Sequence, residues 1–200
     1  MTVGLRYSYE EKDVAFQGDV DDGIAPVGVF IQENFSVTAE DDWSNVSGRV
    51  VVDYQMDDDV MLYGSISNGF KSGGFIGSPS TPQRAAQSFD EETALNYEFG
   101  FKSFMLDSTL KLNGAIFFTD YEDLQVTRFA QLADNPTNAF GEFITENAAS
   151  AEIQGIELEF AWMATEDLEF GGSYAYLDAT YEAVSYTHLR AHETPINIVF

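Results

Sequence analysis

The sequence predicts an all-β chain, an antiparallel meander of about seven strands that forms part of a transmembrane β-barrel. Three observations support this prediction. Apolar residues alternate with polar or small ones over stretches of about a dozen residues, longer than the roughly 5–6 residues of an average strand. Long and short connections alternate along the chain, which places all the long loops at one end. Aromatic residues make up 14% of the chain, which suits the aromatic girdles of such barrels.

The clearest strands form a hairpin within residues 89–125, with a turn near Leu106 and Asp107. Helical spacing at i, i+3 and i+4 fits this segment poorly. On each strand we expect one apolar face towards lipid and one polar face towards the lumen. The expected outward residues of the chain are Leu95, Tyr97, Phe99, Leu110, Leu112, Phe118, Ile156, Leu158 and Phe170. The expected inward residues are Glu98, Lys102, Lys111, Asn113, Glu157 and Glu159.

Five further strands are expected on either side of this hairpin. They cover residues 2–13, 46–55, 60–68, 144–162 and 168–181. Long loops are expected at 14–42, 69–88 and 127–142, and short turns at 56–59 and 163–167. A soluble β-sandwich is the alternative architecture, but nothing in a sandwich requires its loops to be sorted by length.

Composition excludes several classes of protein. The chain has 200 residues and a net charge of -25, from 34 acids against 9 Lys and Arg. Nucleic-acid binding is therefore not expected. No apolar run reaches the roughly 18 residues of a transmembrane helix. Without cysteine there is no disulfide framework, thiol catalysis or Cys-based metal site.

The acidic residues concentrate in the expected loops and turns. A solvated surface is the simpler interpretation, and divalent-cation binding is the alternative. Asp19, Asp21, Asp22 and Gly23 lack the spacing of an EF-hand, so no metal or cofactor is predicted. Glu157 and Glu159 share one strand face and are interpreted as polar lumen lining rather than a catalytic pair. We predict no enzymatic activity and no catalytic residues.

Several short motifs appear in a fixed order. They are LYGSISNGFKSGGF at 62–75, YEFGFKS at 97–103, AIFFTDY at 115–121, NAA at 147–149, QGIELE at 154–159 and YLDATY at 176–181. With these motifs the chain resembles the barrel of TonB-dependent outer-membrane receptors over roughly residues 2–184. The resemblance implies a 22-stranded barrel in the outer membrane of a Gram-negative bacterium. It also implies an N-terminal plug and import of a ferric siderophore or similar scarce ligand, energised by the TonB–ExbB–ExbD system.

The resemblance also indicates where a ligand would bind. Extracellular loops and the upper lumen of the family help to capture it, and Lys71, Ser72, Gly73 and Gly74 enter one of the long loops. With Arg84 and Arg128 they are the predicted ligand contacts, although the glycines have the simpler role of permitting turns. The alternatives are a passive porin-like channel and an inactive gene fragment. The plug, the TonB-contacting segment and the signal peptide are expected to lie outside this chain.

The tail at 185–200 is expected to be foreign to the barrel. Its first residues, SYTHLRAHET, resemble a translated sequencing-adapter read-through, and the strand pattern changes after Val184. His188 and His192 have an i, i+4 spacing that would suit zinc on a helix. Because both lie in this tail, we interpret them as part of the artefact. The predicted domain is therefore residues 1–184.

Overall fold

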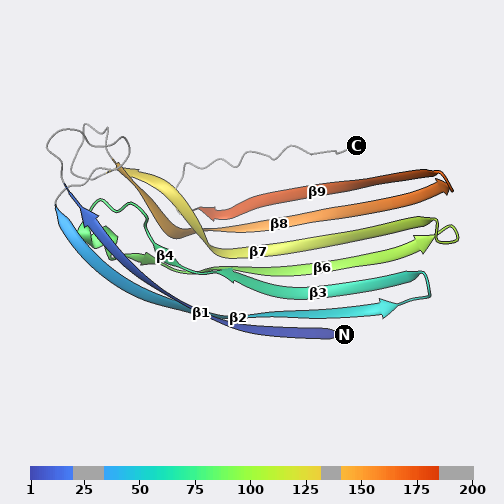
Figure 1. Ribbon diagram of the computed structural model, residues 1–200, viewed down its shortest axis with the longest axis horizontal. Helices are drawn as coiled ribbons and strands as arrows, with labels where there is room; N and C mark the ends of the chain where they lie inside the picture. Colours follow the sequence, from blue (N-terminus) through green and yellow to red (C-terminus); the bar gives the residue numbers. More distant parts are fainter. Residues whose placement is uncertain (20–33, 132–140, 185–200) are drawn as a thin grey trace.

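The computed structural model describes residues 1–19, 34–131 and 141–184 (Figure 1). Its main element is one antiparallel sheet of seven strands in the order β1-β2-β3-β6-β7-β8-β9. The strands are β1 Thr2–Gly18, β2 Phe35–Gln55, β3 Val60–Lys71, β6 Glu92–Met105, β7 Leu110–Gln131, β8 Gly141–Thr165 and β9 Leu168–Val184. The order in the sheet follows the order in the chain. The predicted seven-stranded meander is thus confirmed.

Between β3 and β6 the chain forms small elements outside the main sheet. They are β4 (Gly74–Phe75), α1 (Pro82–Ala85) and β5 (Ser88–Phe89). β4 and β5 pair with each other to form a two-stranded sheet. The segment therefore has its own structure.

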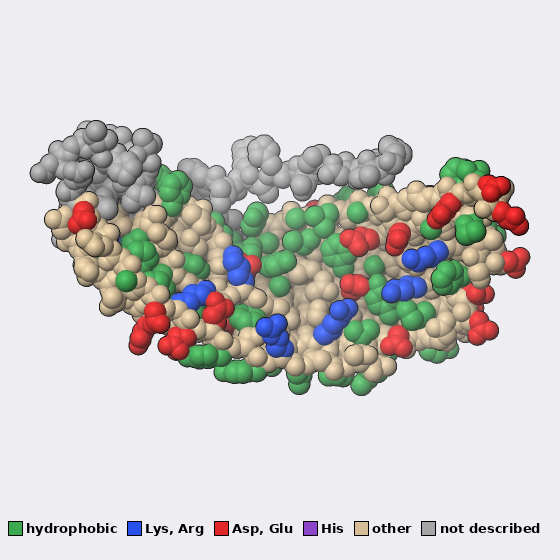
Figure 2. Space-filling model, in the orientation of Figure 1, with side chains coloured by type: hydrophobic (Ala, Val, Ile, Leu, Met, Phe, Trp, Pro, Cys, Tyr) green, Lys and Arg blue, Asp and Glu red, His purple; other side chains and the backbone are tan. Residues whose placement is uncertain are grey.

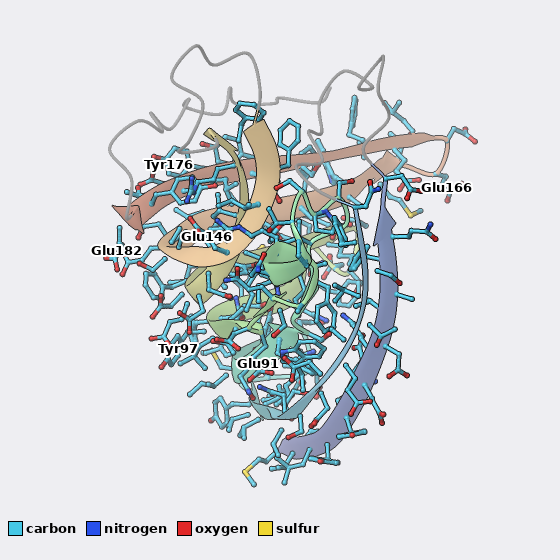
Figure 3. All side chains as sticks on the ribbon, turned by 90° about the vertical axis from the view of Figure 1, so that its left-hand side faces the viewer. Glu91, Tyr97, Glu146, Glu166, Tyr176 and Glu182 are labelled. Carbon is cyan, nitrogen blue, oxygen red and sulfur yellow. The ribbon has the colours of Figure 1, made fainter. Side chains whose placement is uncertain are left out.

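The sheet is strongly curved and open (Figures 1 and 3). β1 and β9 form its two edges and do not pair with each other. The short connections β2–β3, β6–β7 and β8–β9 all lie at one end of the sheet, called here the turn end. The opposite end, called the loop end, carries the segment with β4, α1 and β5.

The pairing register of the main sheet shows on which of its two faces each strand residue lies. Directly paired residues of an antiparallel sheet lie on the same face. Tyr97, for example, pairs with Ile66 on β3 and with Phe118 on β7. The register places the nine predicted outward residues on the same face as Tyr97 and the six predicted inward residues on the opposite face. Figure 3 shows Tyr97 on the outer side of the curved sheet, so the division into an outer and an inner face is confirmed.

Many outward apolar side chains are exposed. Leu5 is 80% exposed and Tyr7 66%. A water-soluble monomer rarely exposes a continuous apolar surface of this extent. The outward face therefore has the character of a surface that meets lipid.

The central turn lies where the sequence predicts it. β6 ends at Met105 and β7 begins at Leu110. Leu106, Asp107 and Ser108 have φ angles of 54°, 54° and 64°, in the left-handed region that residues other than glycine seldom adopt. Asp107 suits such a position because its short polar side chain can form local hydrogen bonds.

Two of the three long loops are shorter than predicted. The expected loop at 14–42 is wrong, because β1 continues to Gly18 and pairs with β2 from Phe35. Tyr7 and Tyr9 face outward, whereas Val14 and Phe16 occupy the alternate positions and face inward. The apolar side chains therefore change from one face to the other within β1. Because this breaks the alternation of apolar and polar residues, the sequence pattern does not indicate a strand beyond residue 13.

The other loop boundaries are corrected in the same way. The expected loop at 127–142 is wrong at both ends, because β7 reaches Gln131 and β8 begins at Gly141. An irregular register between Tyr121 and Gln125 interrupts the alternation just before this extension. The expected loop at 69–88 begins later, because β3 continues to Lys71.

Aromatic rings cover glycines on neighbouring strands. Phe117 pairs directly with Gly155, and a Cβ added at Gly155 would lie 2.5 Å from the Cζ atom of Phe117. The same arrangement recurs in the pairs Tyr63–Gly100, Phe101–Gly114 and Phe160–Gly172. A ring lying over a glycine shields backbone that the missing side chain leaves bare. These glycines are therefore sites of cross-strand packing.

The remaining parts of the prediction lie beyond the described residues. The tail at 185–200, with His188 and His192, is outside them, as are Asp21, Asp22 and Gly23. In the part of the chain that is described, no helix is long and apolar enough to cross a membrane.

The ring-over-glycine packing predicts which glycines tolerate a methyl group. Gly155→Ala should lower the free energy of unfolding by about 1–3 kcal/mol, because the Phe117 ring must move. Gly69→Ala is the matched control, since a Cβ there meets nothing within 4 Å. Urea unfolding in lipid vesicles measures both. Equal effects of the two substitutions would contradict the packing argument.

Candidate functional site

The most elaborate structure at the loop end is the segment of residues 72–91, called here the inward loop. It connects β3 to β6, contains β4, α1 and β5, and lies inside the curve of the sheet (Figure 3). Within it Ser80 and Ala85 are fully buried, and Ile76 is 5% exposed. The inward loop is therefore packed against the wall.

Local sequence explains the helical turn of the inward loop. The hydroxyl of Thr81 accepts a hydrogen bond from the backbone N–H of Arg84 at 3.3 Å and so caps α1. Pro82 follows at the first helical position, where its missing N–H costs nothing. The Arg84 guanidinium donates to the Gln87 side-chain oxygen at 2.9 Å.

Trp43 of β2 supports the inward loop by packing. Its ring meets Phe75 edge-on, with centroids 6.3 Å apart. A Cβ added at Gly73 would lie 2.2 Å from both the Trp43 Nε1 atom and the Phe89 carbonyl oxygen. Only glycine fits this position without pushing the loop from the wall.

Lys12 of β1 fixes the start of the inward loop by hydrogen bonds. Its Nζ atom donates to the Ser72 hydroxyl at 2.8 Å and to the Gly73 carbonyl at 2.5 Å. The same ammonium lies 3.1 Å from a Glu10 carboxylate oxygen and 5.3 Å from the centre of the Trp43 ring. The hydrogen bond from Lys12 lowers the pKa of Glu10, so the contact stabilises the ionised carboxylate.

Two side-chain amides hold both ends of the inward loop. Gln125 of β7 donates to the carbonyls of Ser72 and Asp90, each at 3.0 Å. Asn147 of β8 accepts from the Asp90 N–H at 2.8 Å and donates to the Asp90 carbonyl at 3.0 Å. Asn147 thus satisfies both backbone groups of Asp90, as a neighbouring strand would.

β2 makes two polar contacts with the C-terminal end of the inward loop. The Asn45 amide donates to the Glu91 carboxylate at 3.0 Å, and the Ser88 hydroxyl donates to the Asp41 carboxylate. Residues from β1, β2, β7 and β8 therefore all bond to the inward loop. This number of anchors indicates a fixed element.

The inward face carries most of the positive charge. By register Arg6, Lys12, Arg49, Lys71, Lys102 and Lys111 all face inward, and Arg84 lies on the inward loop. Figure 2 shows Lys and Arg side chains along the length of the visible face. The residues from Val60 to Phe89 include no Asp or Glu, although the chain has 34. An anion approaching residues 60–89 would meet no carboxylate of that stretch; the acids of the inward loop, Asp90 and Glu91, lie at its return to β6.

The predicted ligand residues divide into two groups in the structure. Gly73 and Gly74 are buried, and Ser72 bonds to Lys12, so these three residues have structural roles in anchoring the loop. The Lys71 side chain is 64% exposed and lies 3.9 Å from Glu92. Arg84 belongs to the inward loop. Arg128 lies farther along β7 and forms an ion pair with Glu146, at 2.6 Å between Nε and Oε1.

Sequence reasoning missed the residues that hold the loop in place. Lys12, Trp43 and Gln125 belong to strands or loops that carried no site prediction. Asn147 was noticed only within its motif. No local signal reveals these roles, because each contact joins residues far apart in the chain, such as Asn147 and Asp90.

The described residues do not suggest a metal centre. Among them, no group of three or more His, Cys, Asp or Glu side chains could hold a metal ion.

The fold defines the class of protein: an open wall of a membrane β-barrel with long loops at one end and short turns at the other. The chain belongs to the TonB-dependent receptor-like β-barrel family, whose family model matches residues 1–196. This membership places it in the outer membrane of a Gram-negative bacterium, with the loop end outside the cell. The family consists of receptors.

Two curated relatives are similar to the chain in sequence. The metal-pseudopaline receptor CntO of Pseudomonas aeruginosa is 31% identical over 131 residues, which cover 66% of this chain and 16% of that protein. The pesticin receptor of Yersinia enterocolitica is 27% identical over 159 residues, which cover 80% of this chain and 20% of that protein. The chain thus spans a fifth or less of these relatives.

Solved structures share the fold. The ferric yersiniabactin uptake receptor FyuA of Yersinia pestis matches with a TM-score of 0.69 and 21% identity, over 90% of this chain and 24% of that one. The siderophore receptor PiuA of Acinetobacter baumannii matches with a TM-score of 0.60 and 19% identity, over 97% of this chain and 25% of that one. These similarities establish the fold alone.

The anchoring predicts the effect of removing the Asn147 amide. In the full-length protein, Asn147→Ala removes its bonds to Asp90, and docking of the inward loop should weaken by about 2 kcal/mol. Hydrogen exchange in residues 72–91 should then be faster by about thirtyfold. Asn96→Ala is the control, because Asn96 bonds to Thr119 on the same sheet and does not bond to the loop. Unchanged exchange in the first variant would contradict the anchoring role.

Proposed function

We propose that this chain forms part of the wall and mouth of a receptor that imports a ferric siderophore or a similar metal chelate. The observation that carries the proposal is the inward loop. It is held inside the curve of the sheet at the outer end. Arg84 within the loop and the exposed Lys71 at the end of β3, just before the loop, stand in the longest stretch of the chain without acids. An anionic chelate is the ligand that such a surface favours in an otherwise acidic protein.

The relatives support this choice of ligand. The relative CntO is a receptor for metal-pseudopaline, and the structurally similar FyuA is an uptake receptor for ferric yersiniabactin. Both ligands are named with a metal. Family resemblance adds the energy source, the TonB–ExbB–ExbD system, acting through a plug domain outside this chain. The receptor would bind and move its ligand without catalysing a reaction.

The chain alone should not transport. β1 and β9 would leave unpaired N–H and C=O groups in the bilayer, at several kcal/mol each. Seven strands also enclose too narrow a space for a chelate, because barrel diameter grows with strand number. We therefore assign the activity to the full-length receptor, with this chain supplying wall and outer loops.

The role of Arg84 can be tested by substitution in the full-length receptor. Arg84→Gln should weaken binding of an anionic ferric siderophore by about tenfold or more, because a charged hydrogen bond is lost. Gln83→Ala is the control, as an exposed neighbour on the same helical turn. Binding to cells is measured with radiolabelled iron chelate, at matched surface levels of receptor. Equal binding by both variants and the parent receptor would show that Arg84 does not contribute to ligand binding.

Transport itself is tested in a strain that lacks the receptor. The full-length form should restore uptake only when the TonB system is intact. Uptake without that system would support a passive porin-like channel instead. Uptake restored by residues 1–184 alone would contradict the assignment of activity to the full-length protein.

A further inference from the structure

Three buried side-chain oxygen atoms without a hydrogen-bond partner lie where the inward loop meets β1 and β2. They are Ser8 Oγ, Asn45 Oδ1 and Glu91 Oε2, and the described residues contain no other buried side-chain atom of this kind. Ser8 and Asn45 pair directly on the inward face, and the Asn45 amide donates to the other Glu91 carboxylate oxygen at 3.0 Å. Figure 3 shows Glu91 inside the curve of the sheet. The three atoms therefore form one group, called here the oxygen cluster.

The oxygen cluster differs from the other attachments of the inward loop. Asp90, next to Glu91, has both of its backbone groups bonded to Asn147. At the start of the loop Lys12 bonds to Ser72. Most buried polar groups in folded proteins are bonded, because folding removes their hydrogen bonds to solvent and an unpaired group lowers stability. Three exceptions in one place indicate a partner that all three atoms share.

The chemistry of the oxygen cluster shows what that partner has to supply. An ionised carboxylate only accepts hydrogen bonds, so the NH₂ group of Asn45 must face Glu91, which leaves Asn45 Oδ1 without a donor. Asn45 Oδ1 and Glu91 Oε2 are both acceptors and cannot bond to each other. The Ser8 hydroxyl has one hydrogen, which can serve only one of them. A partner that satisfies all three atoms donates two hydrogen bonds and accepts one.

A water molecule has this set of groups. It carries two hydrogens for the two acceptors and an oxygen that accepts from a hydroxyl. Buried waters typically make about three hydrogen bonds to polar groups that otherwise have no partner. A metal ion fits less well, because only one of the three oxygens is charged and Ca²⁺ takes roughly 6–8 oxygen ligands. Arg6 lies beside Ser8 on the inward face of β1, and its charge would oppose a cation.

We propose that one buried water molecule occupies the oxygen cluster, donating to Asn45 Oδ1 and Glu91 Oε2 and accepting from the Ser8 hydroxyl. Direct bonds already connect the C-terminal end of the inward loop to β2 through Asn45 and to β8 through Asn147. The water adds β1. Both ends of the loop are then attached to β1, because Lys12 holds the start. The site concerns the position of the loop and does not depend on the ligand that the receptor imports.

A crystal structure of the full-length receptor, at a resolution that shows ordered water, tests the proposal directly. The expected result is one water molecule at hydrogen-bond distances of about 2.7–3.2 Å from all three oxygens. Absence of ordered density between the three atoms would overturn the proposal, as would a direct hydrogen bond from Ser8 to either of the other two oxygens. A metal ion with shorter contacts of about 2.0–2.6 Å would also overturn it.

Hydrogen exchange in residues 88–91 of the full-length receptor tests the same bridge in solution. Ser8→Ala removes the hydroxyl that donates to the water, and exchange should become faster by about fivefold. When Glu91→Ala is also present, the water has lost its partner on the loop, so Ser8→Ala should have little further effect. Glu91→Gln should preserve the effect of Ser8→Ala, because the water can accept from the new amide and donate to Ser8 instead.

Ser47→Ala is the matched control. Ser47 is the next inward residue of β2, pairs with Arg6 and does not belong to the oxygen cluster. Its effect on exchange should be the same with and without Glu91→Ala, since sites that share no partner act independently. Unchanged exchange in residues 110–120 of β7 verifies that the wall remains folded. An equal effect of Ser8→Ala with and without Glu91→Ala would overturn the proposal, as would an equal loss of effect for Ser47→Ala.

Discussion

Backbone hydrogen bonding in a layer without water is the constraint on which the rest of this structure depends. Each unpaired N–H or C=O group in hydrocarbon costs several kcal/mol, so a chain crossing as strands must pair every strand with its neighbours. The antiparallel register that results fixes the face of each side chain. Tyr97 faces lipid because Ile66 and Phe118 do, and Glu98 faces the lumen because it is one residue later. The same constraint implies that β1 and β9 need partners beyond the seven described strands.

Beyond the bilayer the constraint relaxes, and the chain uses other means of support. β1 and β2 continue as a ribbon, but Val14 and Phe16 now point inward, because the outer surface there meets water. The inward loop leaves the main sheet altogether. Side chains replace the backbone hydrogen bonds to the main sheet that the loop does not make. Gln125 and Asn147 bond to its backbone carbonyls, and Lys12 bonds to its first residues. A loop fixed in this way can hold Arg84 at a constant position relative to Lys71 at the end of β3.

Most of the wall could be predicted from the sequence, because strand periodicity is a local signal. Alternation from Leu95 to Phe101 identifies a strand and its lipid face directly. The strand ends near Gly18, Phe35 and Gln131 were missed for a physical reason, since the apolar pattern changes face or register where the bilayer ends. The site was predicted only in part. Gly73 and Gly74 stand out as turn residues, but their burial against Trp43 and Phe89 depends on contacts between distant strands.

The central claim is that one face of this sheet meets lipid and the other meets the lumen. It is tested most directly by nitroxide scanning of residues 96–102 on β6, in the full-length receptor reconstituted in bilayers. Gly100 is left unlabelled, because the Tyr63 ring covers it. Collision with oxygen, which concentrates in lipid, should be highest at Tyr97, Phe99 and Phe101. Collision with a water-soluble nickel chelate should be highest at Asn96, Glu98 and Lys102. A period of two with these phases is the predicted result, and a reversed phase or a period near 3.6 would contradict the account.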